Sequence, residues 1–490
     1  MSSSIPLSSI DSKLGKDEDE PHNSKGLGWI VTALFVVGCL AGGGIVAIPT
    51  ALIQATPYLG VAILLTMAAI VTFTSFIVGK SWNQLRDCWP EYREYTRKPY
   101  SEIGFRAVGP RMRVFVSLVN SCSQFMTGVV YLLLSSKNIK DAAKAFLDID
   151  LTFCLVVLIV ALCLLPFTFL RSPVDFWWVI VLAMLTTSGA VALILVGAAR
   201  DYSTCSTHNS LPDLKPSNIF LALGTFLFSF CGHAAFPTIQ HDMKTPTDFT
   251  KSTYLAFGIT TLMYVVTGVA GFLAYGDSLR SSVINSVQTI AIQQAINLLI
   301  TVHLLLTLVM AFNPVSQELE DLFRVPHTFC WQRVVVRTAV LATATFVAES
   351  VPSFGPLLDL VGGSTLTLSA IIFPSIFFFL LNARHEKMLE TGEDHGPVTD
   401  IKEVIKYNRP WILLACAITV VLGFIGGGAA TFSAIRQIIS TKFEYPCYVS
   451  AFLDRETMAA TTSTNCCGRF QNLTVFDSVT CSLPDTHFYK

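Results

Sequence analysis

The segment Gly42-Gly43-Gly44-Ile45-Val46-Ala47-Ile48-Pro49 lies inside a stretch, residues 26–79, that contains no charged side chain. At about 1.5 Å per helical residue, a hydrocarbon core of about 30 Å takes about 20 residues, so this stretch predicts two membrane spans with a turn near Thr56-Pro57-Tyr58. A regular helix tolerates the quoted segment poorly, because each glycine costs up to about 1 kcal/mol relative to alanine and proline removes a backbone donor. We therefore expect the first span to be interrupted here.

A second segment has the same spacing. In Phe228-Ser229-Phe230-Cys231-Gly232-His233-Ala234-Ala235-Phe236-Pro237, proline follows glycine by five residues, as Pro49 follows Gly44. Matching glycine/proline interruptions in two halves of a membrane protein indicate an inverted-repeat transporter, whose binding site lies where the breaks meet. A broken helix frees N–H groups for a carboxylate and C=O groups for an ammonium, and a zwitterionic amino acid needs both. Close helix packing is the alternative explanation, and we favour it for Gly426-Gly427-Gly428, which has no counterpart in the other half.

The composition of the whole chain is that of a membrane protein. Of its 490 residues, 52% are hydrophobic and only 14% are charged, against about 25% charged in soluble domains. The other charge-free runs are residues 114–136, 151–170, 176–199, 216–241, 252–276, 281–317, 360–383 and 410–435. One more apolar segment, residues 331–351, carries Arg333 and Arg337, which we expect to snorkel toward the headgroups. Together these segments predict eleven membrane-spanning helices, because the runs lack the alternation of a barrel.

The lysines and arginines indicate the orientation. With the N-terminus in the cytoplasm, 19 of them fall in inner loops and six in outer loops, as the positive-inside rule requires. We divide the chain into a disordered cytoplasmic tail (residues 1–25), a transmembrane domain (26–435) and an outer tail (436–490) that is extracellular or lumenal.

The outer tail has the marks of an oxidising compartment. It contains the sequon Asn472-Leu473-Thr474, with Asn472 as the candidate glycosylation site, and a cluster of cysteines. The cysteines expected to form disulfides are Cys447, Cys466, Cys467 and Cys481, with Cys205 of an outer loop as a fifth. The sequence does not determine their pairing. It leaves the plasma membrane and an endolysosomal or vesicular membrane as alternatives.

Several motifs resemble the amino acid/auxin permease family, which includes vesicular inhibitory amino acid transporters and proton-coupled amino acid transporters. The matching segments are Gly42 to Pro49, Lys98-Pro99-Tyr100-Ser101-Glu102-Ile103-Gly104 with Gly109, Tyr131-Leu132-Leu133-Leu134, Phe230-Cys231-Gly232-His233 through Pro237-Thr238-Ile239-Gln240, and Gly271-Phe272-Leu273-Ala274-Tyr275-Gly276. The resemblance implies an all-α fold with a five-plus-five inverted repeat of the leucine-transporter type. The repeats would be residues 26–200 and 216–383, with a peripheral helix over 410–432.

The resemblance also implies roles for individual residues. By position, Gly42, Gly43, Gly44 and Ile45 would line the substrate carboxylate site. The ammonium end would be faced by Ser229, Phe230 and Gly232. Ser123 and Thr127 of the third span are further candidates for the substrate site.

Ionisable residues inside a membrane are functional candidates, because they are expensive to bury there. His303 in the eighth span, with Thr307 one turn away, and His233 after the second break are the candidates for ion coupling. In folds of this kind, span eight faces the first break, where a coupling sodium can sit, but a histidine there could carry a proton instead. A neutral, hydrogen-bonded core histidine is the alternative for each. For Asp359 and Glu349, near predicted interfaces, we expect solvated positions at loop ends.

The functional prediction is a secondary active transporter of amino acids or amino-acid-like transmitters, driven by a proton or sodium gradient. No hydrolase, zinc, thiol-redox or nucleotide-binding motif is found in the sequence, so we predict no enzyme activity, no metal site and no cofactor beyond the coupling ion. A net charge of −1 gives no basic excess for nucleic acid. The expected partners are the substrate and the lipid bilayer, with no obligate protein partner. The main alternative is an amino-acid-sensing transceptor that signals to cytoplasmic partners, and a passive channel is a third.

Overall fold

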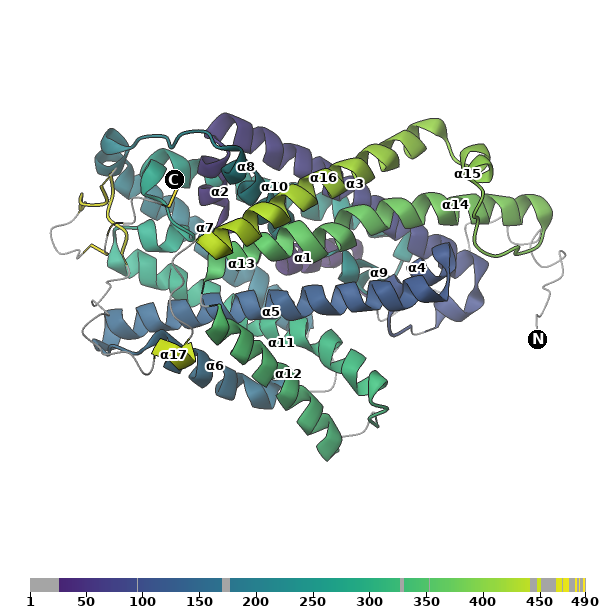
Figure 1. Ribbon diagram of the computed structural model, residues 1–490, viewed down its shortest axis with the longest axis horizontal. Helices are drawn as coiled ribbons and strands as arrows, with labels where there is room; N and C mark the ends of the chain where they lie inside the picture. The colour runs from purple at the N-terminus through teal and green to yellow at the C-terminus, as the bar shows by residue number, and fades with distance from the viewer. Residues whose placement is uncertain are drawn as a thin grey trace.

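The computed structural model describes residues 26–94, 96–169, 177–326, 330–351, 353–440, 447–450, 464–468, 470–475, 481, 482, 484, 488 and 489. Over these residues the chain is helical, with two isolated β-bridges and no β-strand. The predicted disordered tail, residues 1–25, lies outside the described residues. Figure 1 shows an elongated bundle in which α4, α14 and α15 lie at one end and the described C-terminal segments at the other.

The bundle is built from long apolar helices and several shorter ones. The long helices are α3 (Pro57–Cys88), α5 (Pro110–Leu147), α7 (Trp177–Cys205), α10 (Phe249–Tyr275), α11 (Ile290–Leu322), α12 (Trp331–Ser350), α14 (Phe373–Thr391) and α16 (Pro410–Ser440). The shorter helices are α1 (Trp29–Leu40), α2 (Ile48–Gln54), α4 (Pro99–Val108), α6 (Phe153–Thr168), α8 (Pro216–Ser229), α9 (Phe236–His241), α13 (Phe354–Val361), α15 (Ile401–Tyr407) and α17 (Cys447–Ser450).

These helices take the places of the eleven predicted spans. In the described part of the chain, eight helical segments are long and apolar enough to cross a membrane, and α1 and α6 are shorter apolar helices. α12 takes the place of the ninth span and packs against α5, α6 and α11. α16 is the least buried of the eight segments, which agrees with the peripheral position predicted for the last helix.

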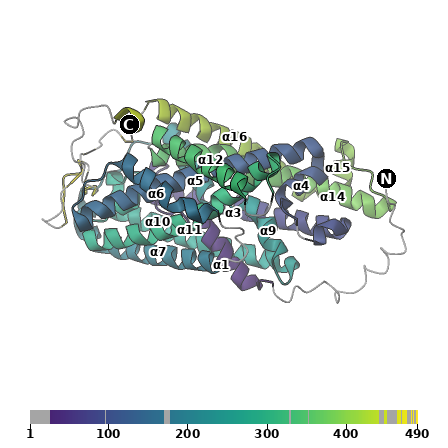
Figure 2. The same ribbon diagram turned by 90° about the horizontal axis from the view of Figure 1, so that it is seen from below.

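Both predicted interruptions are present. α1 ends at Leu40 and α2 begins at Ile48, with proline in its first turn, and α8 ends at Ser229 before α9 begins at Phe236. Proline is tolerated in the first turn of a helix because its missing N–H would have no intrahelical acceptor there. α1 packs against α7 and α10, as Figure 2 shows for α7, and the residues of its break are buried.

The sequence analysis did not predict an irregularity in the tenth span. Between α13 and α14 the helix widens into two π-helical stretches, Gly362–Leu366 and Leu368–Ile372. Gly362 is in backbone contact with Gly224 of α8, so α8 and this span approach more closely than side chains would allow. π-Helical turns inside longer helices are frequent at functional sites.

The expectation that Arg333 and Arg337 snorkel was wrong. Both side chains are buried, and both form ion pairs with Glu320 of α11, at 3.4 Å and 2.6 Å. α12 turns its arginines toward the bundle, where Glu320 pairs with both and the Thr168 carbonyl accepts a hydrogen bond from Arg337. Their charges are paired inside the protein, which removes the need to reach the headgroups.

All five cysteines expected to form disulfides do so. The pairs are Cys205–Cys467, Cys466–Cys481 and Cys154–Cys447. Cys154 was not predicted, because it lies in the apolar sequence of α6 and resembles any core cysteine. The bridged segments lie at one end of the bundle, where the Asn465 N–H donates to Asn285 O at 2.8 Å. Asn472 is exposed at the same end.

Candidate functional site

The two helix breaks meet in the core of the bundle. A Cβ placed on Gly44 would lie 2.8 Å from Cα of Ser229, and one on Gly232 would lie 3.1 Å from Cδ2 of Leu40. The end of α8 at Ser229 therefore lies against Gly44 of the first break, and the end of α1 at Leu40 lies against Gly232 of the second break. Any side chain larger than hydrogen at Gly44 would displace α8.

The break between α1 and α2 has free backbone donors. Among the residues that the structure describes, no backbone carbonyl accepts a hydrogen bond from the N–H groups of Gly43 and Gly44. The Gly44 carbonyl is occupied, since it accepts from Ala47 at 2.9 Å and from Ile48 at 3.2 Å. Unpaired N–H groups at an interrupted helix are suited to an anionic group such as a carboxylate.

A tyrosine on α10 joins the two breaks. The Tyr264 Oη lies 3.0 Å from Leu40 O, at the end of α1, and 2.7 Å from Ser229 O, at the end of α8. Tyr264 is fully buried, and its single O–H donates toward carbonyls that the helix ends leave without intrahelical donors. The sequence analysis did not identify this residue.

His303 and Tyr131 face the first break. The His303 Nδ1 lies 2.9 Å from Ala183 O and 2.8 Å from Thr187 Oγ1. Because the carbonyl can only accept, we assign the ring proton to this nitrogen. A Cβ on Gly42 would be 2.9 Å from His303 Nε2 and 2.9 Å from Tyr131 Oη. In the described part of the chain neither atom has a hydrogen-bond partner. Two polar atoms are therefore directed at the break, as predicted for His303 but not for Tyr131.

The sequence contained a signal for Tyr131. It follows Thr127 by four residues on α5 and therefore lies on the same helical face.

The two predicted substrate residues of α5 are not placed at the breaks. The Ser123 hydroxyl donates to Val119 O of its own helix at 2.9 Å, and no described contact brings Ser123 or Thr127 to the breaks.

Phe230 and Ile45 pack into the protein beside the breaks. The ring of Phe230 packs against α10, at 5.0 Å from the ring of Tyr264 and 6.3 Å from that of Phe257. Ile45 is completely buried. Gly43 lies close to the ring of Tyr131, whose Cε1 would be 3.2 Å from a Cβ.

His233 and Thr307 have structural partners. The His233 Nε2 lies 2.9 Å from Thr74 Oγ1, 3.0 Å from Ser75 Oγ and 3.2 Å from Val71 O, and so ties the second break to α3. The Thr307 hydroxyl donates to His303 O at 2.9 Å within its own helix.

The expectation of a solvated Asp359 was wrong. Asp359 lies on α13, and its side chain is only 4% exposed. It accepts a hydrogen bond from Thr225 Oγ1 of α8. α8 and α13 pack directly against each other next to Asp359, because a Cβ on Gly224 would be 2.7 Å from the Asp359 carbonyl oxygen. Glu349, near the end of α12, is partly exposed, as expected.

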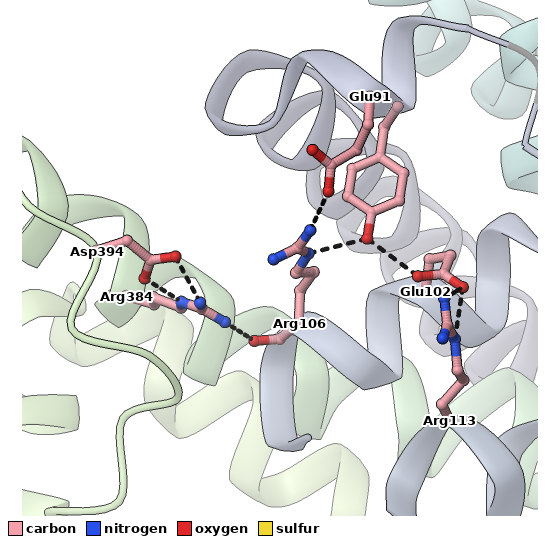
Figure 3. Close-up of polar contacts among 7 residues, drawn as sticks. Glu91, Glu102, Arg106, Arg113, Arg384 and Asp394 are labelled. Carbon is pink, nitrogen blue, oxygen red and sulfur yellow. Dashed lines mark hydrogen bonds and ion pairs between the residues drawn. The ribbon is translucent and has the colours of Figure 1, made fainter. Parts of the chain in front are cut away.

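A polar network joins the two halves of the chain at the end where α4 and α14 lie (Figure 3). Arg384 of α14 forms a bidentate pair with Asp394, at 2.8 and 2.7 Å, and donates to the Arg106 carbonyl of α4. The Trp89 ring contacts both guanidinium groups, with its centroid 4.5 Å from Cζ of Arg106 and 4.8 Å from Cζ of Arg384. Burial acts to raise the pKa of Asp394, but the bonds from Arg384 outweigh it and hold the pKa below its usual value.

The same network continues within the first half. Arg106 donates to Tyr92 Oη at 2.8 Å and to Glu91, and Tyr92 Oη donates to Glu102 at 3.0 Å, which also pairs with Arg113. Burial raises the pKa of Tyr92 to about 12, so its hydroxyl remains a donor to the carboxylate. These bonds hold α4 against the Pro90–Arg93 turn and the start of α5, and the bond from Arg384 to the Arg106 carbonyl links α4 to α14.

The proteins that are similar to this chain in sequence are described as amino acid transporters. The sequence model of a family described as transmembrane amino acid transporter protein matches residues 25–394. The amino acid transporter AVT1C of Arabidopsis thaliana is 25% identical over 411 residues, which are 82% of this chain and 68% of that protein. AVT1H of the same plant, also described as an amino acid transporter, is 27% identical over 369 residues, covering 72% and 82% of the two chains.

Solved transporters share the fold at low sequence identity. A manganese transporter of Eremococcus coleocola superposes with a TM-score of 0.53 at 12% identity, covering 89% of this chain and 93% of the other. Mhp1 in its inward-facing conformation superposes with a TM-score of 0.51 at 13% identity, covering 90% and 99%. At such identities the likeness concerns the fold alone.

Proposed function

Because the chain belongs to the transmembrane amino acid transporter family, we propose that it is a secondary active transporter of amino acids or amino-acid-like transmitters. It works by alternating access and is coupled to a proton or sodium gradient. The observation that carries this proposal is the contact between Gly44 and Ser229, which brings two interrupted helices together beside unpaired N–H groups.

The substrate carboxylate binds at the first break. The N–H groups of Gly43 and Gly44 donate to it, and Tyr131 Oη is close enough to the break to add a third donor. The ammonium group is received at the end of α8, where helix carbonyls carry partial negative charge. No charged side chain is in contact with the breaks in the described part of the chain, so the site suits a substrate whose two charges cancel.

His303 is the candidate for coupling. Its protonated Nδ1 is held by Ala183, which leaves Nε2 directed at Gly42. Protonation of Nε2 would place a positive charge beside the substrate carboxylate, so proton binding and substrate binding would strengthen each other. The sodium alternative uses carbonyls of the break and the hydroxyl of Thr307.

The disulfide-bearing end of the bundle is the extracellular or lumenal end, and the N-terminus is cytoplasmic. Three disulfides at one end are typical of an oxidising compartment, and Asn472 is exposed there for glycosylation. The membrane is the plasma membrane or that of an endolysosomal or vesicular compartment.

Uptake by proteoliposomes tests the proposal. Purified protein is assayed with a panel of radiolabelled amino acids under an imposed proton gradient, an imposed sodium gradient, or neither. We expect at least one substrate to accumulate above equilibrium under one gradient only. Equilibration without accumulation would indicate a channel, and specific binding without uptake would favour the transceptor.

A further inference from the structure

The geometry points to Asp359 as a second proton-binding group of the transporter, one that couples protonation to the contact between the two breaks. We propose this role on the basis of the transport function proposed above. The proposal names the proton as the coupling ion and assigns a role to a residue that lies outside the substrate site. Asp359 lies on α13, in the half of the span before the π-helical stretches, with its carboxyl group enclosed between α8 and α13.

The carboxyl group has a hydroxyl partner but no cationic one. Thr225 Oγ1 donates to Asp359 Oδ1, and the Asp359 side chain is buried. An ionised carboxylate enclosed in hydrocarbon without a cation is costly, so the closed arrangement favours the neutral acid.

The charged groups of the surrounding helices do not reach Asp359. α13 packs against α8, α16, α5 and the first π-helical stretch. α8 and the π-helical stretch carry no charged residue, and Arg436 of α16 is exposed. On α5, Asn285 donates to Asp141 at 3.0 Å, and Lys137 and Lys140 lie beside Asp141. The other charged residues of α5 also lie elsewhere: Arg111 is exposed, Arg113 pairs with Glu102, and Lys144 pairs with Asp148 at 2.9 Å.

Two hydrogen bonds connect Asp359 to the meeting point of the breaks. Thr225 donates to Asp359, Ser229 Oγ donates to Thr225 O at 2.7 Å, and Ser229 lies against Gly44. Next to Thr225, a Cβ on Gly224 would be 2.7 Å from Asp359 O, so the two backbones are in direct contact.

This arrangement gives protonation a mechanical consequence. With the proton bound, α8 and α13 pack closely and the end of α8 is held against the first break. When the proton leaves, the carboxylate requires water, and the least costly way to admit it is to separate α8 from α13. The π-helical stretches that follow are the part of the tenth span best able to absorb such a movement.

A proton suits this site better than sodium. The Thr225 hydrogen already points at the carboxylate, whereas a metal ion needs several oxygen atoms turned toward it. Among the described residues Thr225 is the hydrogen-bond partner of the carboxyl group. The predicted ligand of Asp359 is therefore a single proton.

The test separates proton coupling from substrate movement. In proteoliposomes, Asp359→Asn is compared with wild type in two assays: accumulation of labelled substrate driven by a pH gradient, and counterflow, in which external labelled substrate exchanges with internal unlabelled substrate at equal pH. The expected result is that the variant keeps counterflow, with its pH dependence reduced to the part that His303 contributes, while its pH-driven accumulation falls well below that of wild type. Asp213→Asn, at an exposed acid in the loop before α8, is the matched control and should behave as wild type.

Asp359→Glu covers the case in which the asparagine variant fails to fold. It retains the titrating group and should accumulate substrate under a pH gradient with a displaced pH profile. Wild-type accumulation and pH profile in Asp359→Asn would overturn the inference. So would wild-type protein driven by sodium and not by protons, although the proposed function would then stand. Absence of accumulation by wild type under either gradient would overturn the proposed function itself.

Discussion

Gly44, in the break between α1 and α2, lies directly against Ser229, the last residue of α8, so closely that a Cβ on the glycine would be 2.8 Å from Cα of the serine. The two residues are separated by most of the first repeat. Their contact is where the interrupted helices of both repeats join, and the free N–H groups of Gly43 and Gly44 lie beside it.

Replacement of Gly44 should disrupt this contact. We expect Gly44→Val to abolish substrate binding and to destabilise the protein by about 1–3 kcal/mol, because overpacking forces α8 away from the break. Gly428→Val is the control, since a Cβ there meets no atom within 4 Å. Equilibrium binding of labelled substrate and thermal unfolding in detergent measure the two effects. Retained affinity in Gly44→Val would contradict the assignment of the site.

Removal of the Tyr264 hydroxyl should loosen both breaks together. Tyr264→Phe leaves the carbonyls of Leu40 and Ser229 without this donor in a buried setting, and we expect a loss of about 1–3 kcal/mol in stability together with weaker substrate binding. Tyr254→Phe, at an exposed tyrosine on the same helix, should change neither. If Tyr264→Phe matches the control in thermal unfolding and in affinity, the hydroxyl does not hold the breaks.

The two buried histidines should respond differently to substitution. His303→Gln should flatten the pH dependence of transport, because histidine is the side chain that titrates nearest neutral pH and its free nitrogen faces the first break. His233→Gln should leave the shape of the pH profile unchanged and lower the unfolding temperature, because it removes the tether to Thr74 and Val71. Initial uptake rates across a pH series distinguish them. An unchanged profile in His303→Gln would exclude this residue as a coupling group.

Asp242, beyond the end of α9 and outside the spans, should make stability depend on pH. Burial raises the pKa of its carboxyl group from 3.8 to about 6. The native state therefore holds the proton more tightly than the unfolded chain, and the stability that this contributes is complete below pH 3.8 and is lost as the pH rises through about 6. Asp242→Asn cannot lose a proton, so its unfolding temperature should exceed that of wild type increasingly over this interval.

Thermal unfolding in detergent at a series of pH values measures the Asp242 effect. The exposed Asp213→Asn variant serves as the reference for removal of one negative charge. A constant difference between Asp242→Asn and wild type at every pH would mean that the carboxyl group is not buried in solution.

The sequence alone determined the spans and the places where two of them break. Hydrocarbon excludes charged side chains and requires the backbone to satisfy its own hydrogen bonds, so charge-free runs reveal helices directly. Glycine and proline act on the backbone of their own helix, which is why Gly44 to Pro49 and Gly232 to Pro237 were sufficient to predict both interruptions. The cysteines of the tail were likewise recognised as disulfide partners from their number and place.

Only the tertiary structure decided which side chains meet at the breaks. Helices in a membrane are apolar on every side, so the sequence carries little information about their rotation, and rotation decides whether a residue faces lipid, a neighbour or the site. Tyr264 could not be selected for this reason. Tyr131 shares a helical face with Thr127, but the sequence did not show that this face meets the first break. Asp359, expected at a solvated loop end, lies buried against Thr225. Arg337 was expected among headgroups and lies beside Glu320, because a carboxylate on a different helix compensates its charge at lower cost than exposure to lipid.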